Sequence, residues 1–72
     1  MSKVSTVQFT RGSQCIRIVR EEDMGRWKLL VDGVAPDTMA QEFADVVACV
    51  RAQSELEQQL LANGYQLESK SP

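Results

Sequence analysis

Apolar and polar residues alternate in three stretches of the first half of the chain: residues 7–10, 14–20 and 26–31. Successive side chains of a strand point to opposite faces of a sheet, so this alternation is typical of strands with one covered face. Glycine-containing segments, residues 11–13 and 21–25, separate the three stretches and indicate tight turns. The sequence therefore predicts an antiparallel three-stranded meander.

The three predicted strands give the sheet one apolar face and one mixed face. The apolar face, which we expect to carry a helix, contains Ile16, Ile18, Trp27, Leu29 and Val31. The opposite face contains Cys15, Arg17, Val19, Arg26, Lys28 and Leu30. Long cationic side chains can cover aliphatic neighbours on a solvated face, or they can bind anions. Arg17, Arg26 and Lys28 are therefore a possible basic surface on the outside of the sheet.

A long amphipathic helix is predicted over residues 38–62. Thr38 and Gln41 have the spacing of a capping box, and Asp37 is an alternative N-cap. An Asn-Gly pair follows residue 62, and glycine readily takes the left-handed conformation that ends many helices. The helix is therefore expected to follow a short connection over residues 34–37.

The chain ends in a second alternating segment, residues 65–68. It predicts a short fourth strand, paired within the chain or between chains, or an extended tail held by Tyr65 and Leu67. The fold class is therefore α+β: one domain over residues 1–72, in the order strand, strand, strand, helix, strand. Residues 1–5 and 69–72 are expected to be flexible.

The apolar stripe of the predicted helix changes direction along its length. At about 100° per residue, one cluster forms a first core face: Met39, Phe43, Val46, Val47 and Val50. The second half presents a different set, turned by roughly 90°: Cys49, Leu56 and Leu60. One interpretation is a bend near Gln53, where Ser54 and Glu57 fit a second capping box. The alternative is a continuous helix whose second half packs against something other than its own sheet.

The size and charge of the chain favour association with a partner. A 72-residue domain buries a small core, and such domains often gain burial by dimerising. The net charge of −2 is unevenly distributed. Residues 1–33 have six cations against four carboxylates, a net +2, and residues 34–72 have two against six, a net −4. The sheet and the helix are therefore expected to have outer surfaces of opposite charge.

Residues typical of catalytic and metal sites are scarce. The chain has no histidine, and its two cysteines, Cys15 and Cys49, are 34 residues apart without a zinc-binding spacing. The acidic run at residues 21–23 lies in a predicted hairpin loop, where a solvated turn is its simplest interpretation. No glycine-rich phosphate loop is present. We therefore expect no enzyme activity, no metal and no cofactor.

The hydrophobic runs of the chain are short. The longest, residues 46–50, is far below the roughly 20 residues that a membrane span requires. The N-terminal residues also lack the apolar core of a signal peptide. A cytoplasmic location without membrane association is therefore expected.

These patterns favour a small protein-interaction module, which binds a second copy of itself or another protein. The possible interface is formed by side chains for which the predicted sheet offers no obvious partner: Cys49, Leu56, Leu60, Tyr65 and Leu67. A strand at residues 65–68 would add an edge for pairing between chains.

Nucleic-acid binding by the basic sheet surface is the alternative hypothesis. The segment Gly25-Arg26-Trp27-Lys28, followed by Leu29-Leu30-Val31 and a helix, is similar to a pattern in small plant DNA-binding domains and in some integrase arm-binding domains. The resemblance covers about forty residues and implies a three-stranded sheet that lies in the major groove of DNA. An acidic pI near 4.9 reduces the non-specific affinity for phosphates that such binding needs.

Overall fold

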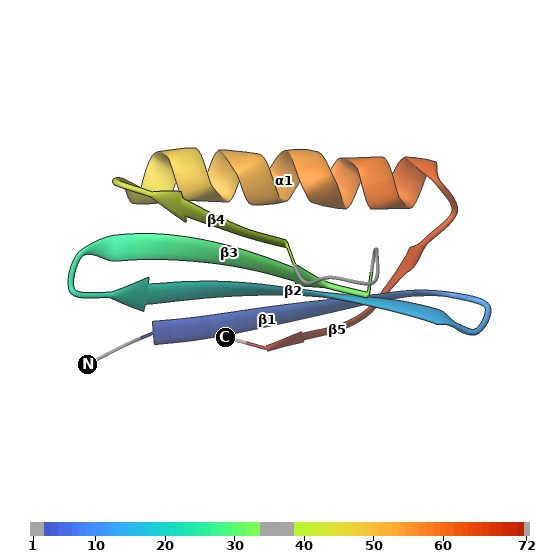
Figure 1. The fold of residues 1–72 in the computed structure, drawn as a ribbon. Helices are drawn as coiled ribbons and strands as arrows, with labels where there is room; N and C mark the ends of the chain where they lie inside the picture. The colour runs from blue at the N-terminus through green and yellow to red at the C-terminus, as the bar shows by residue number, and fades with distance from the viewer. Residues whose placement is uncertain (1–2, 34–38, 72) are drawn as a thin grey trace.

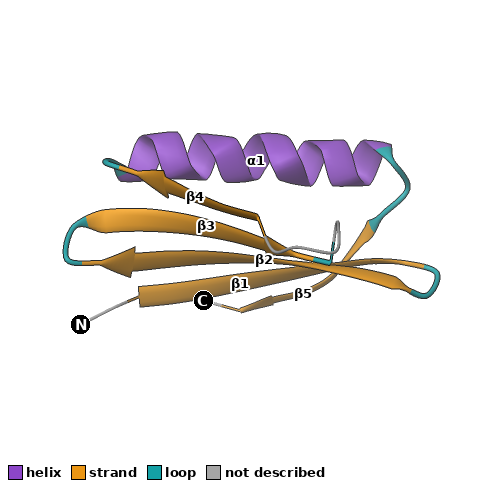
Figure 2. Ribbon diagram, in the orientation of Figure 1, coloured by secondary structure: helices purple, strands orange, loops and turns teal. Residues whose placement is uncertain are grey.

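The computed structural model describes residues 3–33 and 39–71, and it confirms the α+β class. A five-stranded sheet carries one helix on a single face (Figures 1 and 2). The elements are, in order, β1 (Lys3–Arg11), β2 (Gln14–Asp23), β3 (Arg26–Asp32), β4 (Met39–Phe43), α1 (Val46–Ala62) and β5 (Gln66–Ser71).

All neighbouring strands of the sheet are antiparallel, in the order β4-β3-β2-β1-β5. The meander β1-β2-β3 forms as predicted. The segment after the helix pairs with β1 of the same chain, with Phe9 opposite Leu67. The strand continues to Ser71, and β1 already begins at Lys3, so residues 3–5 and 69–71 of the expected flexible ends lie within strands. This intrachain pairing leaves β4 and β5 as the two edges of the sheet.

Residues 39–43 form β4, so the predicted helix start is wrong. The segment Met39–Phe43 pairs with β3, placing Phe43 opposite Trp27 and Glu42 opposite Lys28. Five residues with apolar ends satisfy the periodicity of a helix as well as that of a strand. The open edge of β3, which offers a row of backbone hydrogen bonds, decides between the two. The expected caps Asp37 and Thr38 lie outside the described residues.

The helix begins at Val46 instead, and its N-cap is Asp45 rather than Asp37 or Thr38. Asp45 is extended, and its carboxylate Oδ1 accepts a hydrogen bond from the backbone N–H of Ala48 at 2.9 Å. The predicted end is confirmed. Gly64 has a φ of 90°, and the N–H of Tyr65 donates to the carbonyl of Leu60 at 3.0 Å, as in a Schellman motif. The helix is continuous through Gln53, so the bend is wrong.

The core lies between α1 and the inner face of the sheet. Its buried apolar side chains are Val7, Phe9, Ile16, Ile18, Leu29, Val31, Cys49 and Leu60. Partly buried side chains complete it, namely Trp27, Phe43, Ala52, Leu56 and Tyr65. The predicted first core face of the helix is wrong, because Val46, Val47 and Val50 are exposed. The helix that begins at Val46 has a single buried stripe. It is formed by Cys49 and by the residues four, seven and eleven positions later, namely Gln53, Leu56 and Leu60.

Candidate functional site

The sheet-facing side of α1 contains a polar side chain at its centre. Gln53 is only 4% exposed, and both ends of its amide are hydrogen-bonded. Its Oε1 accepts from Nη1 of Arg20 at 2.9 Å, and its Nε2 donates to the carboxylate of Glu57 at 2.8 Å. Arg20 reaches the helix because it follows Ile16 and Ile18 on the inner face of β2. These two hydrogen bonds form a relay, Arg20–Gln53–Glu57, which joins a cation of the sheet to an anion of the helix.

Cys49 lies on the same side of the helix and is fully buried. Burial raises the pKa of its thiol above the ordinary value of 9.0, and the positive charge of Arg20 opposes part of the shift. Cys15 is exposed on the opposite face of the sheet, and both thiols are free. A buried thiol with a raised pKa is a poor nucleophile, so Cys49 fits a packing role.

The structure places the predicted interface residues mostly inside the chain. Cys49 and Leu60 belong to the core, while Leu56 and Tyr65 pack against it. These side chains have intrachain partners because one straight helix crosses the sheet with a single buried stripe. Only Leu67 is substantially exposed, at 53%. We therefore expect other residues of the helix to form the apolar surface that a partner covers.

The solvent-facing side of α1 carries the apolar surface that the core does not use. We call Val46, Val47, Val50 and Leu61 the helix patch. Val47 is 63% exposed and Leu61 is 55% exposed. A shallow hollow beside the valines is bordered by Arg51, Ser54 and Glu55. These valines were expected in the core as a continuation of Met39 and Phe43, but those two residues lie in β4 and the helix begins only after the Asp45 cap.

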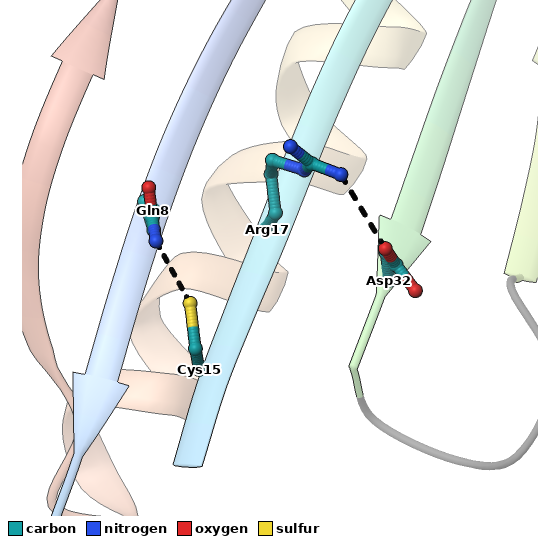
Figure 3. Close-up of polar contacts among 4 residues, drawn as sticks. All are labelled: Gln8, Cys15, Arg17 and Asp32. Atoms are coloured by element: carbon teal, nitrogen blue, oxygen red, sulfur yellow. Dashed lines mark hydrogen bonds and ion pairs between the residues drawn. The ribbon is translucent and has the colours of Figure 1, made fainter. Parts of the chain in front are cut away.

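The predicted basic surface is present on the outside of the sheet, but its charges are paired. Arg17 lies 3.6 Å from Asp32. The dashed line between the two side chains in Figure 3 marks this ion pair. Glu42 of β4 lies 4.0 Å from Arg26 and 3.9 Å from Lys28. All three ion pairs are exposed, so they contribute little stability, but they neutralise the surface.

Two further cross-strand carboxylates lie on this outer face, since Glu21 is opposite Lys28 and Asp23 is opposite Arg26. Nearby, the side-chain amide of Gln8 donates to the Cys15 sulfur at 2.9 Å (Figure 3). Over β2, β3 and β4 the outer face therefore carries more carboxylates than cations. A phosphate bound at Arg17, Arg26 or Lys28 would therefore compete with these carboxylates.

A polar cluster joins the first hairpin to the end of the helix. Arg11 donates to the carbonyl of Asn63 and to the side chain of Gln14, both at 2.8 Å. Its guanidinium also stacks on Tyr65, at 4.5 Å from the ring centroid. The hydroxyl of Tyr65 donates to the same Gln14 oxygen at 2.9 Å. Arg11 thus holds the C-terminal end of α1 against the sheet, which explains the partial burial of Tyr65.

A groove of about 250 Å³ lies between α1 and the β3-β4 side of the sheet. Its walls include Leu29, Val31 and Leu56, and its polar rim includes Gln41 and Glu55. Among the described residues that line the groove, Glu55 is the one titratable side chain. The groove therefore lacks the paired titratable groups typical of acid-base catalysis.

Within residues 3–33 and 39–71, no group of three potential metal ligands comes together. No helix in this part of the chain is both long enough and apolar enough to cross a membrane. Comparisons with protein-family models, with curated proteins and with solved structures found no match to this chain.

Proposed function

We propose that this chain is a non-enzymatic protein-interaction module that forms a homodimer through the helix patch. The observation that supports it is the exposure of Val47, Val50 and Leu61 on a helix whose other side already completes the core. Isolated exposed apolar residues are ordinary, but several on one side of one helix are typical of an interaction surface.

The exposed apolar side chains of the helix patch favour association. Val46, Val47, Val50 and Leu61 are 40–63% exposed. Covering apolar area stabilises a complex by about 25 cal/mol per Å². A contact built on a few side chains of one helix would be weak and reversible.

The charges favour a protein partner over a nucleic acid. The outer face of the sheet has its cations paired with carboxylates. The helix carries Glu55 and Glu57 against the single cation Arg51. Affinity for a phosphate backbone depends on the number of phosphates that cations neutralise. On both described surfaces, carboxylates offset most of the cations.

Sedimentation equilibrium of the unaltered chain and two variants tests the proposal. Val47→Glu places a charge in the helix patch. Ala48→Glu places the same charge about 100° away, in the same turn. Glutamate in the first helical turn is compatible with the helix dipole, so both variants are expected to fold, as circular dichroism can verify.

We expect the average mass of the unaltered chain and of Ala48→Glu to rise from 8.0 kDa toward twice that value with concentration. Val47→Glu is expected to remain at the monomer mass. An unaltered chain that stays monomeric at ~1 mM overturns the proposal. Its affinity for a second copy would then be weaker than that of any specific contact of biological use. A Val47→Glu chain that associates as tightly as Ala48→Glu also overturns it.

A further inference from the structure

We infer that two copies of the chain pair through α1 as an antiparallel helix pair, with the two-fold axis at Ser54. The inference rests on the proposed homodimer and adds its geometry. The occupant of the helix patch is then a second copy of the same patch, because a two-fold axis pairs both its apolar positions and the charges of Arg51 and Glu55 beside it.

The spacing of the exposed residues supports the antiparallel arrangement. Val47 and Leu61 lie seven residues before and after Ser54, so all three share one face of the helix. At a rise of about 1.5 Å per residue, each lies about 10 Å from Ser54 along the axis. A two-fold axis at Ser54, perpendicular to the helix, therefore places each Val47 against the partner's Leu61. Val50 lies along the helix axis between Val47 and Ser54 and adds apolar surface there.

The line through Val47, Ser54 and Leu61 is open to a second molecule. It lies about 130° around the helix axis from the middle of the buried stripe. The sheet covers the other side of the helix, as Figure 1 shows. The serine at the crossing is small, which allows two helices to approach to about 8–10 Å.

The charges beside this line match under the same symmetry. Arg51 and Glu55 both border the hollow next to the valines. Neither forms an ion pair with another described residue. Their own i, i+4 spacing has the cation first, the weaker orientation for pairing within a helix.

In an antiparallel pair, the same flank of both helices meets. Arg51 therefore faces the partner's Glu55, and the symmetry makes this contact twice. A parallel pair would leave the partner's Glu55 on the far flank. The charges thus favour one orientation of two copies over the other.

Cross-linking distinguishes the two orientations. Val47→Cys and Leu61→Cys are each made with Cys15→Ser, which removes the exposed native thiol and leaves Cys49 buried. Disulfides form when two Cα atoms approach to about 4.4–6.8 Å. The two positions lie about 20 Å apart along one helix, so only the antiparallel pair joins one to the other.

Under mild oxidation, we expect a mixture of the two variants to form covalent dimer at least about tenfold faster than either variant alone. Faster cross-linking of Val47→Cys with itself than with Leu61→Cys overturns the antiparallel geometry. Equal rates in all three samples overturn it as well. If the unaltered chain dimerises by sedimentation in either case, the homodimer itself survives. A monomeric unaltered chain overturns both.

Charge reversal gives a second, independent readout. Either substitution, Arg51→Glu or Glu55→Arg, gives positions 51 and 55 of one chain the same charge. In a dimer of two identical variant chains, like charges then face each other. A mixture of the two variants restores opposite charges between chains while each chain keeps its own like charges. We expect the mixed pair to associate about tenfold more tightly than either variant with itself, equivalent to about 1.4 kcal/mol. No gain on mixing contradicts the Arg51–Glu55 contact.

Discussion

The sheet-facing and solvent-facing sides of α1 differ in burial much more than in apolar character. The sheet-facing side buries Cys49, Gln53 and Leu60, all at 6% exposure or less. The solvent-facing side leaves Val47 and Leu61 more than half exposed. A glutamine thus occupies the interior while valine and leucine face water.

The difference shows that partners on the sheet, rather than side-chain hydrophobicity, determine which side of this helix is buried. Gln53 is accommodated because Arg20 supplies a hydrogen-bond donor from the inner face of β2 and Glu57 supplies an acceptor. A buried amide with both ends bonded costs little, whereas an unsatisfied one would cost several times more. The apolar residues Val47 and Leu61 on the other side remain exposed.

The largest effect on stability is expected at Leu60, and the adjacent Leu61, which is exposed, is its control. Leu60→Ala should lower the free energy of unfolding by about 2–4 kcal/mol, because it leaves a cavity in the core. Leu61→Ala should change it by less than about 0.5 kcal/mol, because the side chain is exposed. Urea unfolding at low micromolar concentration, where association is minimal, measures both. Equal losses would contradict the assigned sides.

A smaller effect is expected at the polar centre of the buried side. Gln53→Ala removes both hydrogen bonds and leaves Arg20 without its amide partner, so it should destabilise the fold by about 1–3 kcal/mol. Gln58→Ala, at an exposed position of the same helix, is the matched control and should be nearly neutral. Thermal unfolding compares them. If the two variants unfold at the same temperature, the relay contributes nothing.

The buried thiol of Cys49 predicts a pH dependence of the free energy of unfolding. Because burial raises the pKa of Cys49, the folded chain keeps this proton where the unfolded chain begins to lose it. The contribution to stability is therefore complete below the ordinary pKa of 9.0 and decreases as the pH rises above it. Unfolding free energies on both sides of that pH should show the decrease. Cys49→Ala should remove this slope, and Cys15→Ala should leave it unchanged.

The smallest effect on stability is expected in the helix patch. Val50→Gln should alter the unfolding free energy of the monomer by less than about 0.5 kcal/mol, since the valine is 42% exposed. The same variant should weaken association. Chemical unfolding at low concentration and sedimentation at high concentration separate the two readouts. A loss above about 1 kcal/mol at low concentration would assign Val50 to the core after all.

The locally encoded elements were predictable from the sequence. Alternation identified β2 and β3, and the Asn63-Gly64 pair marked the end of the helix, because strand periodicity and left-handed glycine are properties of short segments. The apolar inner face of the sheet also followed from alternation, as Ile16, Ile18 and Leu29 are buried together.

The remaining features depend on contacts between distant segments. Met39–Phe43 has the periodicity of a helix or a strand, and only the edge of β3 selects the strand. The burial of Gln53 requires Arg20 on the inner face of a strand far away in sequence. The exposed side of the helix was missed for the same reason, because it follows from the position of the Asp45 cap and from the β4 pairing together.

The proposed dimer makes the solvent-facing side of α1 the contact surface for a second copy. Amide NMR spectra of the unaltered chain, recorded over a dilution series, test it most directly. We expect concentration-dependent shifts at Val47, Val50, Ser54 and Leu61, with constant shifts at the outer sheet residue Leu30. Shifts that do not change with concentration, or that change on the outer face of the sheet instead, would contradict it.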